Sequence, residues 1–192
     1  QINQAQALLK SRRPLILMQP KSLLRLQQAM VRLDDLAQGA FHPIIDDPNV
    51  NGRREKVTRL VLCTGKVYYD IVAERARRQI DDIAVVRIEQ LYPFPHDEFE
   101  AQIAAYPAAR SIVWCQEEPG NQGAWHRIQH YLLRHMRPDQ LLGYAMRPSS
   151  ASPAAGYQSL HNEQQKALVE AAFAPLGDNL VMPVQGTGRK GS

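Results

Sequence analysis

The chain alternates between short, almost continuously apolar runs and longer stretches in which apolar residues recur every three or four positions. Five runs are predicted to be β-strands: residues 14–18, 59–63, 83–87, 111–115 and 142–146. The middle three are apolar at nearly every position rather than at every second one. This pattern is typical of parallel strands that are covered by helices on both faces.

Helices are predicted in the gaps between these strands, over residues 66–79, 96–106, 125–136 and 159–173. In the first of them Val67, Ile71 and Val72 share one side, which predicts a buried face. The opposite, exposed side is expected to carry Glu74, Arg75, Arg77 and Arg78. Strand–helix alternation of this kind indicates an α/β fold. We therefore expect a three-layer sandwich around a mostly parallel five-stranded sheet, with right-handed crossovers.

The first strand stands apart, since about forty residues separate it from the next one. Residues 22–39 lie in this interval and are predicted to form a helix. We therefore expect residues 1–40 to be the last strand of a preceding domain plus a helical linker. Residues 41–176 are expected to form the main domain, with a loop at 46–56. Residues 177–192 are glycine-rich and lack a periodic stripe, which predicts a disordered tail.

Composition excludes several classes of protein. Hydrophobic residues make up 44% of the 192, enough for a real core, and no apolar run approaches the roughly 20 residues of a membrane span. The net charge of +4 comes from small groups of basic residues. A nucleic-acid binder usually has a denser basic stripe with exposed aromatics, so no nucleic-acid partner is expected. Cys63 and Cys115 both end apolar strands, which predicts buried, reduced thiols in a cytosolic protein.

The stretch Thr64-Gly65-Lys66 falls between a strand and a helix, where backbone N–H groups favour an anion. It is not a phosphate-binding P-loop, because that spacing requires glycine where Leu60 stands and serine or threonine where Val67 stands. Two interpretations remain open. Lys66 and the helix start could hold a phosphate with Arg87 from the end of the next strand. Alternatively, Lys66 is simply exposed at a capped helix.

Glu117 and Glu118 are adjacent carboxylates at the end of an apolar strand. Neighbouring residues in an extended segment point to opposite faces, so both cannot easily act on one substrate. We interpret them as structural acids. One is expected to pair with a strand-end arginine such as Arg87, and the other to cap backbone N–H groups at the helix start near residues 123–125.

His126 and His130 lie four residues apart on a predicted helix, a spacing that can bind zinc. The glutamate of the zinc-protease pattern does not follow His126. Arg127 and Arg134 are near the pair, and their charges disfavour a bound cation. An exposed helix flank is therefore the favoured interpretation, and no metal site is predicted.

Five stretches, taken together, resemble one family. They are RRPLILMQPKSLLR (12–25), TGKVYYD (64–70), VVRIEQLYPFP (85–95), WCQEEPGNQGAW (114–125) and RPSSASPAAG (147–156). They occur in family order and resemble the C-terminal region of the thiamine diphosphate-dependent decarboxylating component of 2-oxoglutarate dehydrogenase, in the transketolase superfamily. Family members more often carry serine where Thr64 stands, and that difference keeps the hydroxyl.

The resemblance implies a cytoplasmic homodimer (mitochondrial matrix if eukaryotic) that acts in the tricarboxylic acid cycle. It would decarboxylate 2-oxoglutarate on thiamine diphosphate with Mg²⁺ and pass a succinyl group to the lipoyl-bearing succinyltransferase component. Residues 41–176 would be the transketolase-type C-terminal domain, after the last strand of the pyrimidine-binding domain. The family's diphosphate-binding motif and catalytic histidines match no position here, so this segment is expected to be inactive alone. A 2-oxoadipate-specific relative and a stand-alone regulatory module remain alternatives.

The resemblance also implies an effector site, since some relatives carry a nucleotide or coenzyme A site on this domain. The candidate residues for an anion or nucleotide are Thr64, Lys66, Arg87 and Arg147, with the serine-rich loop 149–152. For Glu117 and Glu118 the resemblance agrees with a structural role, because the family run lies on a domain without catalytic residues.

Overall fold

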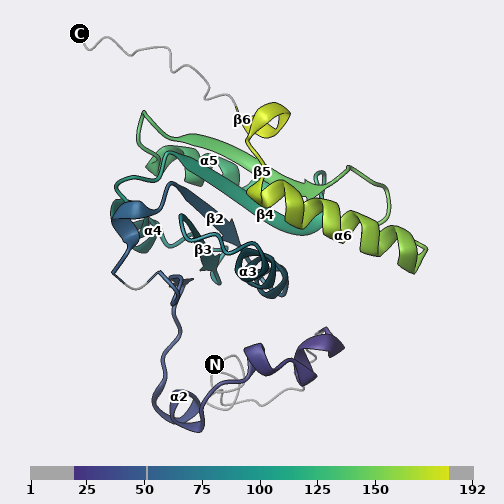
Figure 1. The fold of residues 1–192 in the computed structure, drawn as a ribbon, viewed down its shortest axis with the longest axis horizontal. Coiled ribbons are helices and arrows are strands. Elements are labelled where there is room, and N and C mark those ends of the chain that lie inside the picture. The colour runs from purple at the N-terminus through teal and green to yellow at the C-terminus, as the bar shows by residue number, and fades with distance from the viewer. Residues whose placement is uncertain (1–19, 51, 182–192) are drawn as a thin grey trace. The chain divides into compact units, whose positions relative to one another are not determined.

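The computed structural model describes residues 20–50 and 52–181 (Figure 1). The chain divides into two units, residues 1–42 and 43–192. The described part of the first unit contains 3₁₀-helices at Lys21–Arg25 and Gln27–Ala29, followed by the short helix α2, Leu33–Gln38. The predicted strand at 14–18 lies outside the described residues.

The expectation of one continuous helix over 22–39 is wrong. The backbone is extended at Leu26 and at Met30, which separates the three short pieces. Large apolar side chains of this segment are exposed, among them Leu24 and Leu33. Helices of this length gain most of their stability from burying one face, and no described residue between 20 and 42 is buried.

The second unit is built on a six-stranded sheet in the order β1-β3-β2-β4-β5-β6. The strands are β1 (Ile44–Ile45), β2 (Arg59–Cys63), β3 (Ile83–Ile88), β4 (Ser111–Pro119), β5 (Leu141–Arg147) and β6 (Leu180–Val181). The four central strands, β2 to β5, are parallel, whereas β1 and β6 pair antiparallel at the edges. The mostly parallel sheet is confirmed, but it has six strands rather than five.

Both edge strands escaped sequence reasoning because two residues carry no periodic pattern. β6 also corrects the expected tail. Leu180 and Val181 pair with Gly143 and Leu142 of β5, so the prediction of disorder is wrong for residues 177–181. Residues 182–192 of the predicted tail lie outside the described residues. The preceding Leu176 lies directly over Gly143, where a Cβ atom would be 2.3 Å from the Leu176 Cδ2. A Cβ atom at position 143 would require the Leu176 side chain to move and would lie 3.2 Å from the carbonyl oxygen of Asn179.

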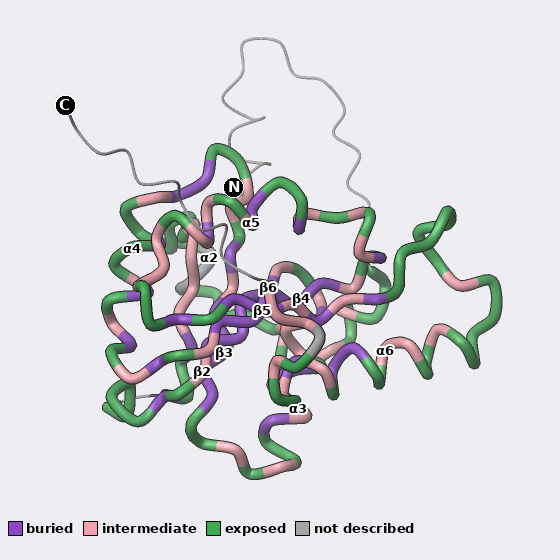
Figure 2. The backbone as a smooth tube through the Cα atoms, turned by 90° about the horizontal axis from the view of Figure 1, so that it is seen from above, coloured by how far each residue is buried: buried purple, intermediate pink, exposed green. Residues whose placement is uncertain are grey.

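Two separate cores cover the two faces of the sheet, because successive side chains of a strand point in opposite directions. Leu60 and Leu62 of β2 pack with the helices α4 (His96–Ala104) and α5 (Trp125–His135). Val61 and Cys63 pack with α3 (Val67–Arg77) and α6 (Gln158–Phe173). Figure 2 shows buried residues concentrated along the central strands and exposed ones around them. The three-layer sandwich is therefore confirmed.

The topology creates a switch point between β2 and β4. From β2 the chain passes through α3 on one face to β3. It then returns through α4 on the other face and crosses β2 to reach β4. The segments that leave β2 and β4 therefore run to opposite faces of the sheet. In open α/β sheets such a point, at the carboxyl ends of the strands, is the preferred place for a ligand.

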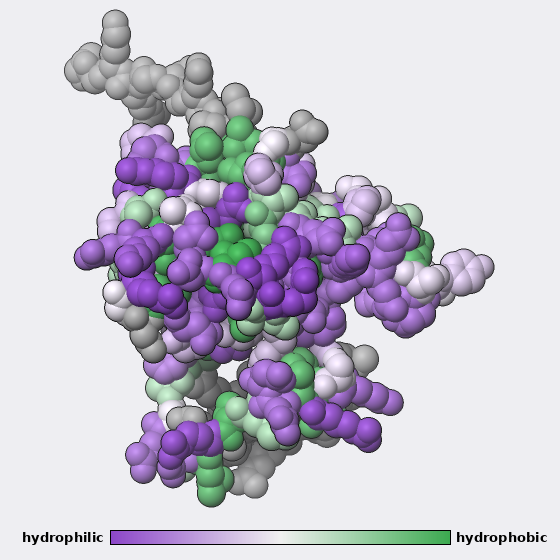
Figure 3. Space-filling model, in the orientation of Figure 1, coloured by the Kyte–Doolittle hydropathy of each residue, from purple (hydrophilic) through white to green (hydrophobic). Residues whose placement is uncertain are grey.

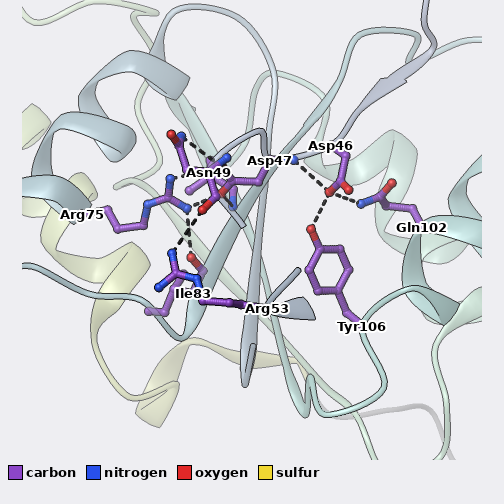
Figure 4. Close-up of polar contacts among 9 residues, drawn as sticks. Asp46, Asp47, Asn49, Arg53, Arg75, Ile83, Gln102 and Tyr106 are labelled. Carbon is purple, nitrogen blue, oxygen red and sulfur yellow. Dashed lines mark hydrogen bonds and ion pairs between the residues drawn. The ribbon is translucent and has the colours of Figure 1, made fainter. Parts of the chain in front are cut away.

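The predicted loop 46–56 contains the best-connected acids of the domain (Figure 4). Asp47 is 4% exposed, and it pairs with Arg75 and accepts the backbone N–H of Val85 at 2.8 Å. Sequence reasoning placed Arg75 on the exposed side of its helix, and that was wrong, since Arg75 is only 7% exposed. Arg75 also donates to the carbonyl of Ile83 at 3.0 Å. The pair thus joins α3, β3 and the 46–56 segment.

The face of the molecule in Figure 3 is mostly hydrophilic, with hydrophobic residues in small patches. Within residues 20–50 and 52–181, no helix has the length and apolar character needed to cross a membrane.

Candidate functional site

All the candidate residues lie at the carboxyl edge of the parallel strands. Thr64 directly follows β2, Arg87 is the second-last residue of β3, and Arg147 is the last residue of β5. Glu117 and Glu118 belong to the end of β4. Parallel strands end at the same edge of the sheet, so residues far apart in sequence meet there.

Glu117 pairs with Lys66, the N-cap residue of α3, just beyond the point where β2 and β4 stop pairing. The side chains are 21% and 29% exposed, so this ion pair is only partly buried. The expectation that a glutamate of this pair would hold Arg87 is wrong, whereas an arginine at a subunit interface, the alternative partner, stays a prediction. Arg87 instead lies 4.6 Å from the ring centre of Tyr68 and 3.6 Å from a carboxylate oxygen of Glu89.

Arg147 turns away from these residues, toward α6. Its Nη2 donates to Gln165 at 2.6 Å, and its Nη1 lies 3.2 Å from the Nδ1 of His161. The side chain lines a separate cavity of about 270 Å³ together with Ser150 and Ser152. Thr64 lines a different pocket beside α5. The four predicted effector residues therefore share one edge of the sheet, but Thr64 and Arg147 line two different pockets there.

Gln116 is the residue that sequence reasoning missed. Its Oε1 accepts the indole N–H of Trp114 at 2.9 Å and the backbone N–H of Trp125 at 3.0 Å. Its Nε2 donates to the carbonyl of Gln122 at 2.8 Å. The start of α5 is therefore held by this amide, not by Glu117 or Glu118 as expected. The signal was an uncharged polar residue continuing a buried run, because such a side chain must find hydrogen-bond partners.

A pocket of about 480 Å³ lies next to this loop, at the switch point between β2 and β4. Its lining residues come from the ends of β2 and β4, the segment after β3 and the first two turns of α5. They are Thr64, Leu91, Tyr92, Trp114, Gln116, Glu118, Gly123, Ala124, Arg127, His130 and Tyr131. The pocket therefore combines aromatic walls with one carboxylate, one guanidinium and one imidazole.

His126 and His130 are both exposed on α5, as expected for a helix flank. Within the described residues, no group of three or more His, Cys, Asp or Glu side chains is placed to hold a metal ion.

Comparison with known proteins shows which family the chain resembles. The family model for the 2-oxoglutarate dehydrogenase C-terminal region matches residues 30–173. The chain belongs to this 2-oxoglutarate dehydrogenase C-terminal family. It is 56% identical over 165 residues to the "2-oxoglutarate dehydrogenase E1 component" of Cupriavidus necator, covering 86% of this chain and 17% of that protein.

Two further relatives carry the same name. The protein of Azotobacter vinelandii is 50% identical over 166 residues, which are 84% of this chain and 17% of the relative. That of Coxiella burnetii is 46% identical over 170 residues, 88% of this chain and 18% of the relative. The chain therefore spans less than a fifth of the length of these relatives.

The two cysteines of this family member are free and buried, as predicted. Cys63 and Cys115 face each other on the neighbouring strands β2 and β4. Burial raises the pKa of both thiols, and for Cys63 the neighbouring Cys115 raises it further. Since the thiolate is the reactive form, these residues act as packing groups, not as nucleophiles.

Proposed function

We propose that this chain is the C-terminal domain of a 2-oxoglutarate dehydrogenase E1 component, an oxidoreductase of the tricarboxylic acid cycle. The observation that carries the proposal is the family match over residues 30–173, joined to relatives that bear this name. In the proposed reaction 2-oxoglutarate is decarboxylated and its succinyl group passes to a lipoyl group of the succinyltransferase component. The enzyme acts as a cytoplasmic homodimer, or in the mitochondrial matrix of a eukaryote.

Thiamine diphosphate and Mg²⁺ supply the decarboxylation chemistry in this proposal. The described residues offer no cluster of carboxylate, imidazole or thiolate groups for the ion. In this proposal the ligands of both groups lie in other parts of the enzyme. The role of the domain is to stabilise the dimer and to shape the surroundings of a site built elsewhere.

The activity is tested with the full-length protein. Release of CO₂ from 2-oxoglutarate and succinylation of a lipoyl acceptor should both be observed, and 2-oxoadipate should be the poorer substrate. A preference for 2-oxoadipate would support the alternative relative. Residues 1–192 alone should show no turnover, and measurable turnover would contradict the assignment of catalysis to other parts of the enzyme.

The dimer is tested on the same full-length protein by sedimentation velocity. A dimer that dissociates when residues 43–181 are deleted would support the proposed role of the domain. An unchanged dimer after this deletion would assign the interface to other domains.

We also propose that Thr64, Lys66 and Arg87 bind an anionic effector, a nucleotide or coenzyme A, with Arg147 at the far end of the same edge. Helix α3 starts beside Lys66, and its free N–H groups favour an anion. Glu117 competes for Lys66, because the two already form an ion pair. Binding of an anion therefore requires this pair to open.

This competition makes the effector proposal testable with two variants of opposite sign. In calorimetric titrations of AMP or acetyl-coenzyme A into the full-length protein, Lys66→Ala should weaken binding and Glu117→Gln should strengthen it. Lys56→Ala, at an exposed position away from the edge, is the matched control. Equal heats from the wild type and both variants would remove Lys66 from the site.

A further inference from the structure

The pocket at the carboxyl ends of β2 and β4, beside α5, contains two opposite charges that have no charged partner in the described part of the chain. Glu118 and Arg127 both line it, and both residues are exposed. Among the described residues, neither side chain takes part in a hydrogen bond or an ion pair. Every neighbouring strand-end charge of the site is engaged by contrast, since Glu117 binds Lys66 and Arg147 binds Gln165.

Much of the remaining pocket wall is apolar or aromatic, with Thr64, Gln116 and His130 as its polar members. Trp114 lies beneath the pocket: it is fully buried and its indole N–H is bound to Gln116, so it offers a ligand no polar group. Leu91 and Tyr131 add further apolar area, and Tyr131 is held in place by stacking on Phe94 at 4.9 Å. The volume of about 480 Å³ suits a small organic molecule, not an isolated ion.

The loop that carries Glu118 is rigidly positioned. Gly123 has a φ of +68°, and a Cβ atom there would lie 2.8 Å from the Nε2 of Gln116 and 3.0 Å from the Glu118 Cβ. Gln116 in turn bonds the carbonyl of Gln122 and the first N–H of α5. These contacts fix the spacing between the Glu118 backbone and the helix turn that carries Arg127. The two charged side chains therefore start from backbone positions that are held relative to each other on the rim of one pocket.

We propose that this pocket binds a free α-amino acid with an apolar or aromatic side chain. The ligand ammonium group pairs with Glu118 and its carboxylate pairs with Arg127, both as charge-assisted hydrogen bonds. The side chain lies against Leu91 and Tyr131. A purely anionic ligand would bring its charge toward Glu118, and a purely cationic one toward Arg127, so a zwitterion is the class that satisfies both groups.

The test titrates ligands that lack one group at a time into the full-length protein by calorimetry. L-Phenylalanine should bind, whereas 3-phenylpropionate lacks the ammonium group and 2-phenylethylamine lacks the carboxylate. Each should bind at least about tenfold more weakly, the loss expected for one charge-assisted contact. L-Alanine should also bind more weakly, because it leaves the aromatic walls uncovered.

Two variants assign each contact to a residue. Glu118→Gln should weaken the binding of phenylalanine by about tenfold. It should leave the affinity for 3-phenylpropionate unchanged or increase it. Arg127→Gln should weaken the binding of phenylalanine and leave the affinity for 2-phenylethylamine unchanged or increase it. The matched controls are Glu117→Gln, whose carboxylate binds Lys66, and Arg134→Gln, which lies two turns further along α5 outside the pocket. Both controls should keep the affinity of the wild type.

Three results would overturn the inference. They are the absence of binding of any amino acid at millimolar concentration, equal binding of 3-phenylpropionate and phenylalanine, and equal losses in the controls and the pocket variants. Because the experiment measures binding, its result does not depend on the proposed decarboxylation activity. An enzyme that turns over 2-oxoglutarate but binds no amino acid would refute this inference and leave the proposed function intact.

Discussion

Two pairs of adjacent acids in this domain have opposite fates. Asp46 and Asp47 follow the edge strand β1 and are fully engaged: Asp47 holds Arg75 and a strand N–H, and Asp46 accepts bonds from Tyr106 and Gln102. Glu117 and Glu118 end the central strand β4. Glu117 has one lysine partner, and within the described chain the carboxylate of Glu118 has none.

The difference between the two pairs follows burial: Asp47 is buried and has several partners, whereas Glu118 is exposed and has none among the described residues. A buried carboxylate must be paired, because an uncompensated charge costs several kcal/mol away from water. An exposed carboxylate is under no such requirement and stays available to a ligand. The acids with the most partners lie in the segment predicted as a loop, whereas of the strand-end pair Glu117 binds Lys66 and Glu118 lines the pocket.

The largest effect is expected from Asp47→Ala. It leaves the Arg75 guanidinium buried without its carboxylate and removes the acceptor of the Val85 N–H. We expect a loss of about 3–5 kcal/mol in the free energy of unfolding, measured by urea denaturation. The control is Asp81→Asn, whose exposed pair with Arg53 should contribute at most about 1 kcal/mol. Equal losses in the two variants would break the comparison.

Gln116→Leu should have the next largest effect. It removes the acceptor of the Trp114 indole and of the first N–H of α5, and the amide is only 1% exposed. Leaving buried donors without a partner costs about 1–3 kcal/mol each, and we expect a loss of roughly 2–4 kcal/mol. Gln116→Glu keeps the acceptor for both N–H groups but removes the donor to the Gln122 carbonyl, so it separates the two kinds of contact. A melting temperature unchanged in Gln116→Leu would show that the loop needs no such anchor.

The pH dependence of stability provides a further test of the first pair, because the pKa of Asp46 is shifted in the folded protein. Burial by itself raises the pKa of this carboxyl, but its hydrogen bonds outweigh burial and hold the pKa below its ordinary value. The donors are Tyr106, the backbone N–H of Asp47, Arg54 and Gln102. A lowered pKa gives stability that is present above the unfolded-state pKa of about 3.9 and is lost as the pH falls through the folded-state pKa.

Asp46→Asn should therefore flatten the fall of stability below about pH 4, followed by urea unfolding at a series of pH values. Tyr106→Phe removes one of the bonds and should cost about 1 kcal/mol at neutral pH. If the free energy of unfolding of Asp46→Asn falls with pH as it does in the wild type, the contacts of Asp46 contribute nothing to stability.

The smallest effects are expected at Glu117 and Glu118. Glu117→Gln breaks a partly exposed ion pair and should cost about 1 kcal/mol. Glu118→Gln removes an exposed carboxylate and should change stability by less than about 0.5 kcal/mol. Thermal melting and sedimentation of both variants check this order. A loss at Glu118 as large as at Glu117 would restore the structural interpretation for both acids.

Sequence reasoning located the four parallel strands and the helices between them, and β2 matches to the residue. It succeeded because each element carries its own pattern over five or more positions. It misplaced Arg75 because helical spacing sets it beside exposed charges, while Asp47, 28 residues earlier, draws it inward. It likewise assigned Glu117 an arginine, because the sequence does not show that Lys66 comes closer than Arg87.

The sequence alone determined the fold class, the two-sided burial of the central strands and the resemblance to a family, since these follow from local periodicity and motif order. Only the tertiary structure decided which charge meets which, where the edge strands add, and that a charged, aromatic pocket opens between β2 and β4. The physical reason is range. Burial patterns are written in neighbouring residues, whereas ion pairs and pockets form between segments that the crossovers bring together.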